Sequence, residues 1–165
     1  RQPPHHARCL HCCAGGCRVR GAGFCAGQRQ LTCMYDEAKH KRQVREALAQ
    51  RGLGAWMSNT KWRELLGAIN ALPFPPPYQR KDLLHAEPEP STFDADVWYL
   101  GDWVEGIHPL YSIEWLRIRP RYLAHAGQLL PPTVVDCEAA LEQALQTLGQ
   151  PYEKADGSIW IYGYR

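Results

Sequence analysis

The residues that could carry out chemistry are concentrated between positions 101 and 121 of this 165-residue chain. Glu114 lies within an apolar run that has the character of a strand, and a carboxylate buried there without a partner would cost on the order of several kcal/mol. We expect it to form an ion pair with a nearby guanidinium, that of Arg117, Arg119 or Arg121. The alternative is a functional carboxylate, either a general base with a shifted pKa or a group that binds a ligand.

A short loop before this run carries further acid–base groups. Asp102, Glu105 and His108 fall within seven residues and flank Trp103. With Glu114 they could form the site of a small hydrolase or transferase, but the same residue types are ordinary in loops. The sequence contains no His-x-x-x-His or His-Glu-x-x-His spacing, no Gly-x-Ser-x-Gly nucleophile elbow and no Walker or Rossmann glycine-rich loop. The sequence therefore favours a protein without catalytic activity and predicts no cofactor.

The same stretch also has the composition of a protein-binding surface. Tryptophan and tyrosine stand beside arginine and an acidic rim, a combination that protein interfaces use. The partner expected from this composition is another protein. The predicted binding residues are Asp102, Trp103, Glu105, Glu114, Arg117, Arg119 and Arg121.

The distribution of charge argues against a nucleic-acid partner. Residues 1–33 contain five arginines and no acidic residue, whereas the rest of the chain has 14 basic and 17 acidic residues and a net charge of −3. A nucleic-acid-binding protein needs a continuous basic face, which this balance does not favour. No apolar run approaches the roughly 20 residues that span a membrane, and no signal peptide opens the chain. We expect a cytoplasmic protein with no membrane partner.

Six of the seven cysteines lie in residues 1–33. A single cysteine elsewhere fits a reducing compartment and no disulfide framework. Metal binding by Cys9, Cys12, Cys13 and Cys17 is the functional alternative, but a second ligand pair with the spacing of a structural zinc site is missing. We predict no metal site. Residues 1–33 are expected to be a disordered Cys/Arg/Gly-rich tail, or sequence upstream of a natural start at Met34.

Residues 34–165 are predicted to form a single α+β domain. In the second and third expected helices, apolar residues recur at i, i+3, i+4 and i+7, which indicates one buried face on each. Asp136 is expected to cap the third helix. Cys137 at that helix end would be either a buried, inert residue or a reactive thiol. The expected helices cover residues 36–51, 58–72 and 136–148.

The predicted sheet is antiparallel or mixed and has about five strands, with two to three helices packed on it. Apolar character in residues 110–119 changes face between Trp115 and Leu116, which indicates a central strand partly buried on both sides or a β-bulge. Residues 121–132 look irregular. The expected strands cover residues 78–84, 97–100, 110–119 and 133–135, followed by a hairpin over 152–164.

Several uncommon strings occur in order along the chain. They are Asn59-Thr-Lys-Trp-Arg-Glu-Leu65, Phe74-Pro-Pro-Pro-Tyr-Gln79, Gly101-Asp-Trp103, Tyr111-Ser-Ile-Glu-Trp-Leu-Arg-Ile-Arg-Pro-Arg121 and Trp160-Ile-Tyr-Gly-Tyr164. As a set they resemble a bacterial domain-of-unknown-function family, number 6678, over about residues 34–165. The resemblance implies a small soluble bacterial protein and brings no assigned activity or catalytic residues. By analogy with other small bacterial domains, an immunity-like or regulatory binding module is expected.

Overall fold

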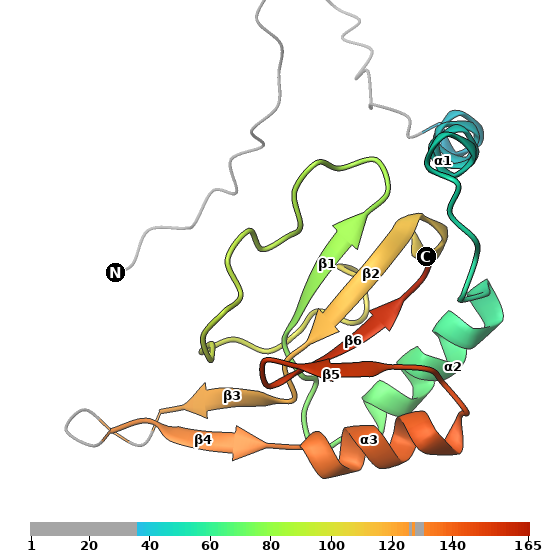
Figure 1. Ribbon diagram of the computed structural model, residues 1–165. Coiled ribbons are helices and arrows are strands. Elements are labelled where there is room, and N and C mark those ends of the chain that lie inside the picture. Colours follow the sequence, from blue (N-terminus) through green and yellow to red (C-terminus); the bar gives the residue numbers. More distant parts are fainter. Residues whose placement is uncertain (1–35, 126, 128–130) are drawn as a thin grey trace, which may run out of the picture. The chain divides into compact units, whose positions relative to one another are not determined.

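Two helices and a four-stranded antiparallel sheet share one hydrophobic core (Figure 1). The computed structural model describes residues 36–125, 127 and 131–165. The predictions made for residues 1–33, including the cysteine ligands, lie outside the described residues. The predicted α+β fold is confirmed, with a four-stranded sheet and a separate two-stranded one in place of a single sheet of about five strands.

The helices begin and end close to where the sequence predicts. Asp36 caps the first by accepting a hydrogen bond from the backbone N–H of Lys39 at 3.0 Å, and Gly52 ends it with a left-handed φ of 64°. The third begins after Cys137, and Asp136 accepts from the N–H of Glu138 at 2.8 Å. The helices are α1 (Glu37–Arg51), α2 (Asn59–Asn70) and α3 (Glu138–Thr147), with one 3-10 turn, η1 (Leu110–Ser112).

The larger sheet has the order β1-β2-β6-β5. Its strands are β1 (Tyr78–Asp82), β2 (Ile113–Ile118), β6 (Ser158–Tyr162) and β5 (Glu153–Ala155). The smaller sheet pairs β3 (Arg121–Ala124) with β4 (Thr133–Asp136). Two strand predictions are therefore wrong, because residues 97–100 form no strand and residues 121–124 form one where irregular structure was expected. The predicted C-terminal hairpin is confirmed, and its turn has positive φ at Asp156 and Gly157.

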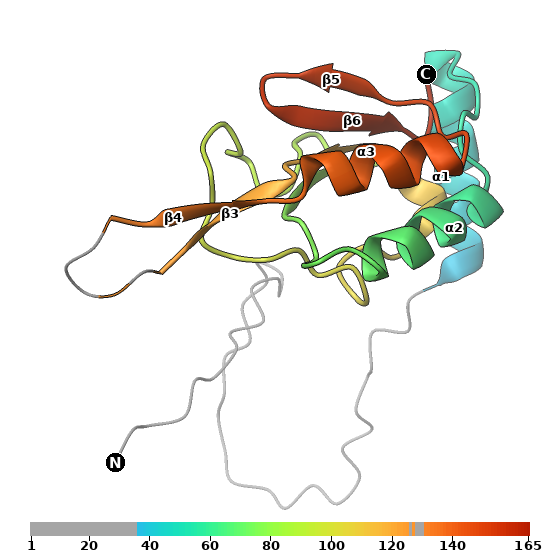
Figure 2. The same ribbon diagram turned by 90° about the horizontal axis from the view of Figure 1, so that it is seen from below.

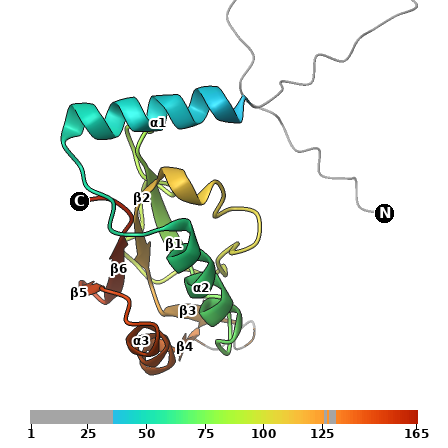
Figure 3. The same ribbon diagram turned by 90° about the vertical axis from the view of Figure 1, so that its right-hand side faces the viewer.

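The core fills the space between the sheet and the helix pair α2–α3, which lie side by side (Figure 2). All of its central side chains are less than 2 % exposed, and burial of each stabilises the fold by about 1.5–3 kcal/mol. These residues are Trp62, Leu65 and Ile69 of α2, Leu141 and Leu145 of α3, and Leu116, Ile118, Ile159 and Ile161 of the sheet. Helix α1 contributes only Val44 as a buried residue and crosses the end of the sheet where β2 begins (Figure 3).

A β-bulge in β2 explains the change of apolar face seen in the sequence. Lys81 pairs with Trp115 and the next residue of β1, Asp82, pairs with Ile113, so Glu114 is the extra residue. The bulge lies one residue earlier than the change of face in the sequence. It brings Ile113 into the same core as Leu116, although an odd spacing would place them on opposite faces of a regular strand.

The close approach of Gly163 to β2 leads to a stability prediction. A Cβ on Gly163 would overlap the carbonyl oxygen of Ile113 and lie 3.2 Å from Trp62 Cζ2, so Gly163→Ala should lower the free energy of unfolding by about 1–3 kcal/mol. A Cβ on Gly67, inside α2, would meet nothing within 4 Å, and Gly67→Ala should raise that free energy by about 0.5–1 kcal/mol. Urea unfolding of both variants measures the two effects, and destabilisation of equal size would contradict the packing assigned to Gly163.

Candidate functional site

A long connection, residues 83–109, joins β1 to η1 and carries many of the polar groups predicted to be functional. It contains no helix and no named strand. Connections of this length without regular structure are uncommon in small domains and are often functional. Side chains from the sheet hold this connection in place, and their contacts decide which of the predicted site residues remain available.

Glu114 is paired, but not with the arginines expected from the sequence. Arg51 at the end of α1 donates two hydrogen bonds to its carboxylate, at 2.5 and 2.8 Å, and Lys81 Nζ lies 3.5 Å from Oε2. The predicted pairing with Arg117, Arg119 or Arg121 is wrong. The hydrogen bonds from Arg51 lower the pKa of Glu114, with Lys81 acting in the same direction. Glu114 is therefore an ionised carboxylate that ties α1 to the sheet.

The three arginines bind the long connection instead. Arg117 Nη1 lies 2.9 Å from Asp94 Oδ1, while Arg119 Nη1 and Arg121 Nε lie 3.1 and 2.7 Å from Asp96 Oδ1. Burial alone would raise the pKa of Asp96, but the hydrogen bonds from the two arginines outweigh it and lower that pKa. Sequence reasoning missed both aspartates. Their alternation at positions 94 and 96, which matches that of the arginines at positions 117, 119 and 121, was the available signal.

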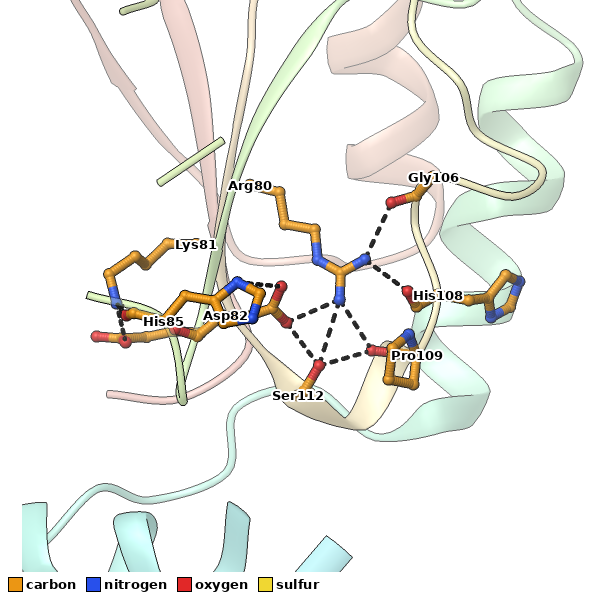
Figure 4. A network of polar contacts seen from close by, with 9 residues as sticks. Arg80, Lys81, Asp82, His85, Gly106, His108, Pro109 and Ser112 are labelled. Carbon is orange, nitrogen blue, oxygen red and sulfur yellow. Dashed lines mark hydrogen bonds and ion pairs between the residues drawn. The ribbon is translucent and has the colours of Figure 1, made fainter. Parts of the chain in front are cut away.

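Buried Arg80 organises the other end of the connection (Figure 4). Its Nη1 donates to the carbonyl oxygens of Gly106 and His108 at 3.0 and 2.9 Å. Its Nη2 donates to Asp82 Oδ1 at 2.7 Å and to Ser112 Oγ at 3.3 Å. Its Nε–H has no acceptor among the described residues. Sequence reasoning missed this network too, and no pattern pointed to it, because its acceptors are mostly backbone carbonyls.

A serine, an aspartate and a histidine lie together at Ser112, Asp82 and His85, but the serine contacts the aspartate and not the histidine. Ser112 Oγ donates to Asp82 Oδ1 at 2.5 Å, whereas His85 Nδ1 lies 3.9 Å from the other carboxylate oxygen. A catalytic histidine would have to accept the serine proton directly. Ser112 is also buried. The group therefore neutralises and positions Arg80 and has no arrangement suited to acyl transfer.

The predicted acid–base loop does not converge on Glu114. Trp103 is buried and donates from Nε1 to the carbonyl of Pro76 at 2.8 Å, while Glu105 and His108 are exposed. Asp102 Oδ1 accepts from the N–H groups of Val104 and Glu105, and such backbone hydrogen bonds, that of Glu105 first, lower the pKa of Asp102. Within residues 36–125, 127 and 131–165, no hydrogen bond or ion pair joins Glu114 to this loop.

Neither Cys137 nor the described metal-ligand residues form a reactive centre. Cys137 is buried, and burial raises the pKa of its thiol to about 11, which favours the buried, inert alternative. In the part of the chain that the structure describes, no group of three or more His, Cys, Asp or Glu residues could hold a metal ion. No helix in that part is long and apolar enough to cross a membrane.

An open cavity of about 390 Å³ lies beside the acid–base loop. The hydroxyl of Tyr78 donates to the carbonyl of Asp102 at 2.6 Å, and burial raises the pKa of Tyr78 to about 12. Two of the residues that line the cavity, Tyr99 and Leu100, are large apolar residues that the solvent reaches, and two more, Trp98 and Val104, lie within four positions of them in the chain. Its lining includes Tyr78, Arg80, Glu89, Tyr99, Leu100 and Asp102. The exposed apolar residues are Trp98 (55 %), Tyr99 (48 %), Leu100 (44 %) and Val104 (72 %).

The pairing of Glu114 should make stability depend on pH. Glu114→Gln should lower the free energy of unfolding by about 1–2 kcal/mol at neutral pH, because the two hydrogen bonds from Arg51 are weakened. The pKa of Glu114 is lower in the folded state, so the stabilisation is complete above its ordinary value of 4.5 and is lost as pH falls through the folded-state value. Urea unfolding across this range should show that the difference in unfolding free energy between the Glu114→Gln variant and the unsubstituted protein disappears in acid. Glu46 is exposed, and Glu46→Gln is the control variant. A difference for Glu114→Gln that does not change with pH would contradict the assignment.

Burial should make Asp82 far more costly to remove than Asp94. Asp82→Ala leaves the buried guanidinium of Arg80 without its counter-charge and should destabilise the protein by about 3–5 kcal/mol. Asp94 also pairs with a buried arginine, but its side chain is 86 % exposed, so Asp94→Ala should cost less than about 1 kcal/mol. Chemical denaturation of the two variants makes the comparison. An equal loss of unfolding free energy in the two variants would show that burial does not strengthen the ion pair between Arg80 and Asp82.

Comparison with known proteins identifies the family without assigning an activity. None of the curated proteins and none of the solved structures matches the chain. One family matches residues 44–165, most of the stretch over which the sequence strings suggested a resemblance, and the expectation is confirmed. Its description is a family of unknown function, which supplies no residue roles. The chain belongs to this family of unknown function, DUF6678.

Proposed function

We propose that this protein is a non-catalytic protein-binding module and that residues 98–104 form the centre of its binding surface. The observation that carries the proposal is the exposure of Tyr99 and Leu100 in the lining of an open cavity, together with that of Trp98 and Val104 in the same segment. Adjacent exposed apolar side chains with a polar rim are typical of surfaces that bind other proteins. A regulatory or immunity-like role in the bacterial cytoplasm, in which binding is itself the function, fits such a surface.

The exposed segment is held in a defined conformation, which favours binding. The N–H of Leu123 donates to the carbonyl of Val97 at 2.8 Å, and the N–H of Gly101 donates to that of Pro75 at 3.1 Å. Beneath the segment, the buried indole of Trp103 is fixed to the carbonyl of Pro76. A surface ordered before binding loses less conformational entropy when a partner arrives. The aromatic side chains are therefore presented on a supported loop.

The proposed surface uses only part of the predicted binding set. Asp102 and Glu105 lie in exposed positions of this loop, whereas Trp103 supports it from below. Glu114 and the arginines at positions 117, 119 and 121 form internal ion pairs. Nothing favours the alternative of a hydrolase or transferase, because Glu114 is already paired with two cations and lies apart from the hydrogen-bonding network of Asp102.

Site-specific photo-crosslinking tests the proposed surface. A benzophenone amino acid replaces Val104 in the full chain, expressed in the cells from which the gene derives. A control chain carries the same group at Val134 of β4, which is also an exposed valine. We expect a defined protein to crosslink at position 104 and not at 134, because a bound partner would cover the first position. Leu100→Asp should suppress that product.

Two outcomes would overturn the proposal. One is a set of crosslinked proteins that is the same at both positions, which would indicate random collisions with exposed valines. The other is no crosslinked protein at position 104 or, in a second chain, at Trp98. Circular dichroism of each chain confirms that the substitutions leave the fold intact, so that either outcome bears on binding and not on folding.

A further inference from the structure

We infer that the cavity beside residues 98–104 receives a basic side chain, best an arginine, of the bound partner protein. This inference rests on the proposed function and adds the chemistry of the partner. The cavity joins two tyrosines, Tyr78 and Tyr99, to two carboxylates, Glu89 and Asp102. Its volume of about 390 Å³ lies in the lower range of cavities that hold ligands, and is large enough for one long side chain.

The charge of the cavity favours a cation. Glu89 and Asp102 are both exposed, and among the described residues neither forms an ion pair with a basic group. Glu87 and Glu105 lie close by in the chain, are also exposed, and likewise form no ion pair within the described part of the protein. A cationic side chain would therefore meet carboxylates that no cation of the described residues already neutralises.

Arg80, the one basic residue of the lining, does not fill this role. Its guanidinium is directed to the carbonyls of Gly106 and His108 and to the carboxylate of Asp82, 2.7 Å away (Figure 4). The side chain is only 10 % exposed, and its charge is balanced by that of Asp82. Arg80 consequently leaves the charges of Glu89 and Asp102 without a cation, although Asp102 Oδ1 already accepts hydrogen bonds from the N–H groups of Val104 and Glu105.

The aromatic walls select a cation that can also stack. Tyr99 is about half exposed, so its ring can lie against a side chain that enters from the solvent. Tyr78 is held in place by its hydrogen bond to the Asp102 carbonyl and by contact with Trp103 at 4.6 Å between ring centroids. A planar guanidinium stacks on tyrosine and donates to carboxylates at the same time, which an ammonium does less well. Leu100 offers an apolar wall to the methylene groups of such a side chain.

Titration with a defined peptide tests this inference without a known partner. The probe is an acetylated and amidated Gly-Gly-Arg-Gly-Gly peptide, and its control carries citrulline, which is neutral and nearly isosteric with arginine. NMR spectra of the full chain follow the backbone amides of Gly101, Asp102 and Gly106. We expect saturable shifts with the arginine peptide, about tenfold weaker binding of the citrulline peptide, and weaker binding at higher salt.

Matched variants identify the carboxylates. Glu89→Gln and Asp102→Asn should each weaken binding of the arginine peptide about threefold to fivefold, since each removes one charge and keeps the shape of the side chain. Glu64→Gln removes an exposed carboxylate of α2 and should leave binding unchanged. Dispersed NMR spectra establish that each variant is folded.

Equal binding of the two peptides, equal effects of all three variants, or the absence of saturable shifts at the cavity would overturn the inference. The two proposals can fail separately. A partner crosslinked at position 104 together with no preference for arginine would reject the cation site alone. Selective binding of the arginine peptide together with no crosslinked partner would reject the protein-binding function and leave a guanidinium site that serves another ligand.

Discussion

Burial of three guanidinium groups is the constraint on which the rest of the structure depends. The side chains of Arg80, Arg117 and Arg119 are 10 %, 9 % and 3 % exposed. A cation removed from water needs acceptors and a counter-charge, because without them the cost reaches several kcal/mol, about 3–5 when a buried pair is broken. Most of those acceptors come from the connection 83–109, and the others are Asp82, Ser112 and Ser158. The sheet thus specifies where an otherwise irregular segment lies.

This arrangement explains how an irregular segment can display apolar side chains. A strand would point alternate residues of 97–100 into the protein, and the sequence suggested such a strand. The backbone instead follows the positions that satisfy the arginines, with the Phe93 carbonyl bonded to Arg119 and Asp96 bonded to Arg119 and Arg121. Phe93 itself is buried. Apolar residues just beyond this anchor consequently remain in contact with solvent, where a second molecule can cover them.

Local patterns predicted the helices and the C-terminal hairpin well, because caps, apolar periodicity and turn residues act over a few positions. The same patterns failed for residues 97–100, which are apolar but form no strand and remain largely exposed to solvent. They also failed for the partners of Glu114. Arg51 lies 63 positions away and reaches Glu114 only after α1 crosses the end of the sheet, so neighbouring arginines in the sequence were the wrong choice. The bulge at Glu114, by contrast, was visible as a change of apolar face.

The charged side chains discussed above fall into two groups, those paired with an opposite charge of the protein and those without a basic partner among the described residues. The charges of Arg80, Arg117, Arg119 and Arg121 are paired with carboxylates of the protein, so their density in the sequence reflects folding and not ligand binding. Those of Glu89, Asp102 and Glu105 have no basic partner among the described residues and cost little to leave in water. The carboxylate of Asp102 also contributes to folding, because it accepts hydrogen bonds from the N–H groups of Val104 and Glu105. Recognition of a basic, partly apolar partner would account for the combination of these carboxylates with exposed tyrosine and leucine on one surface.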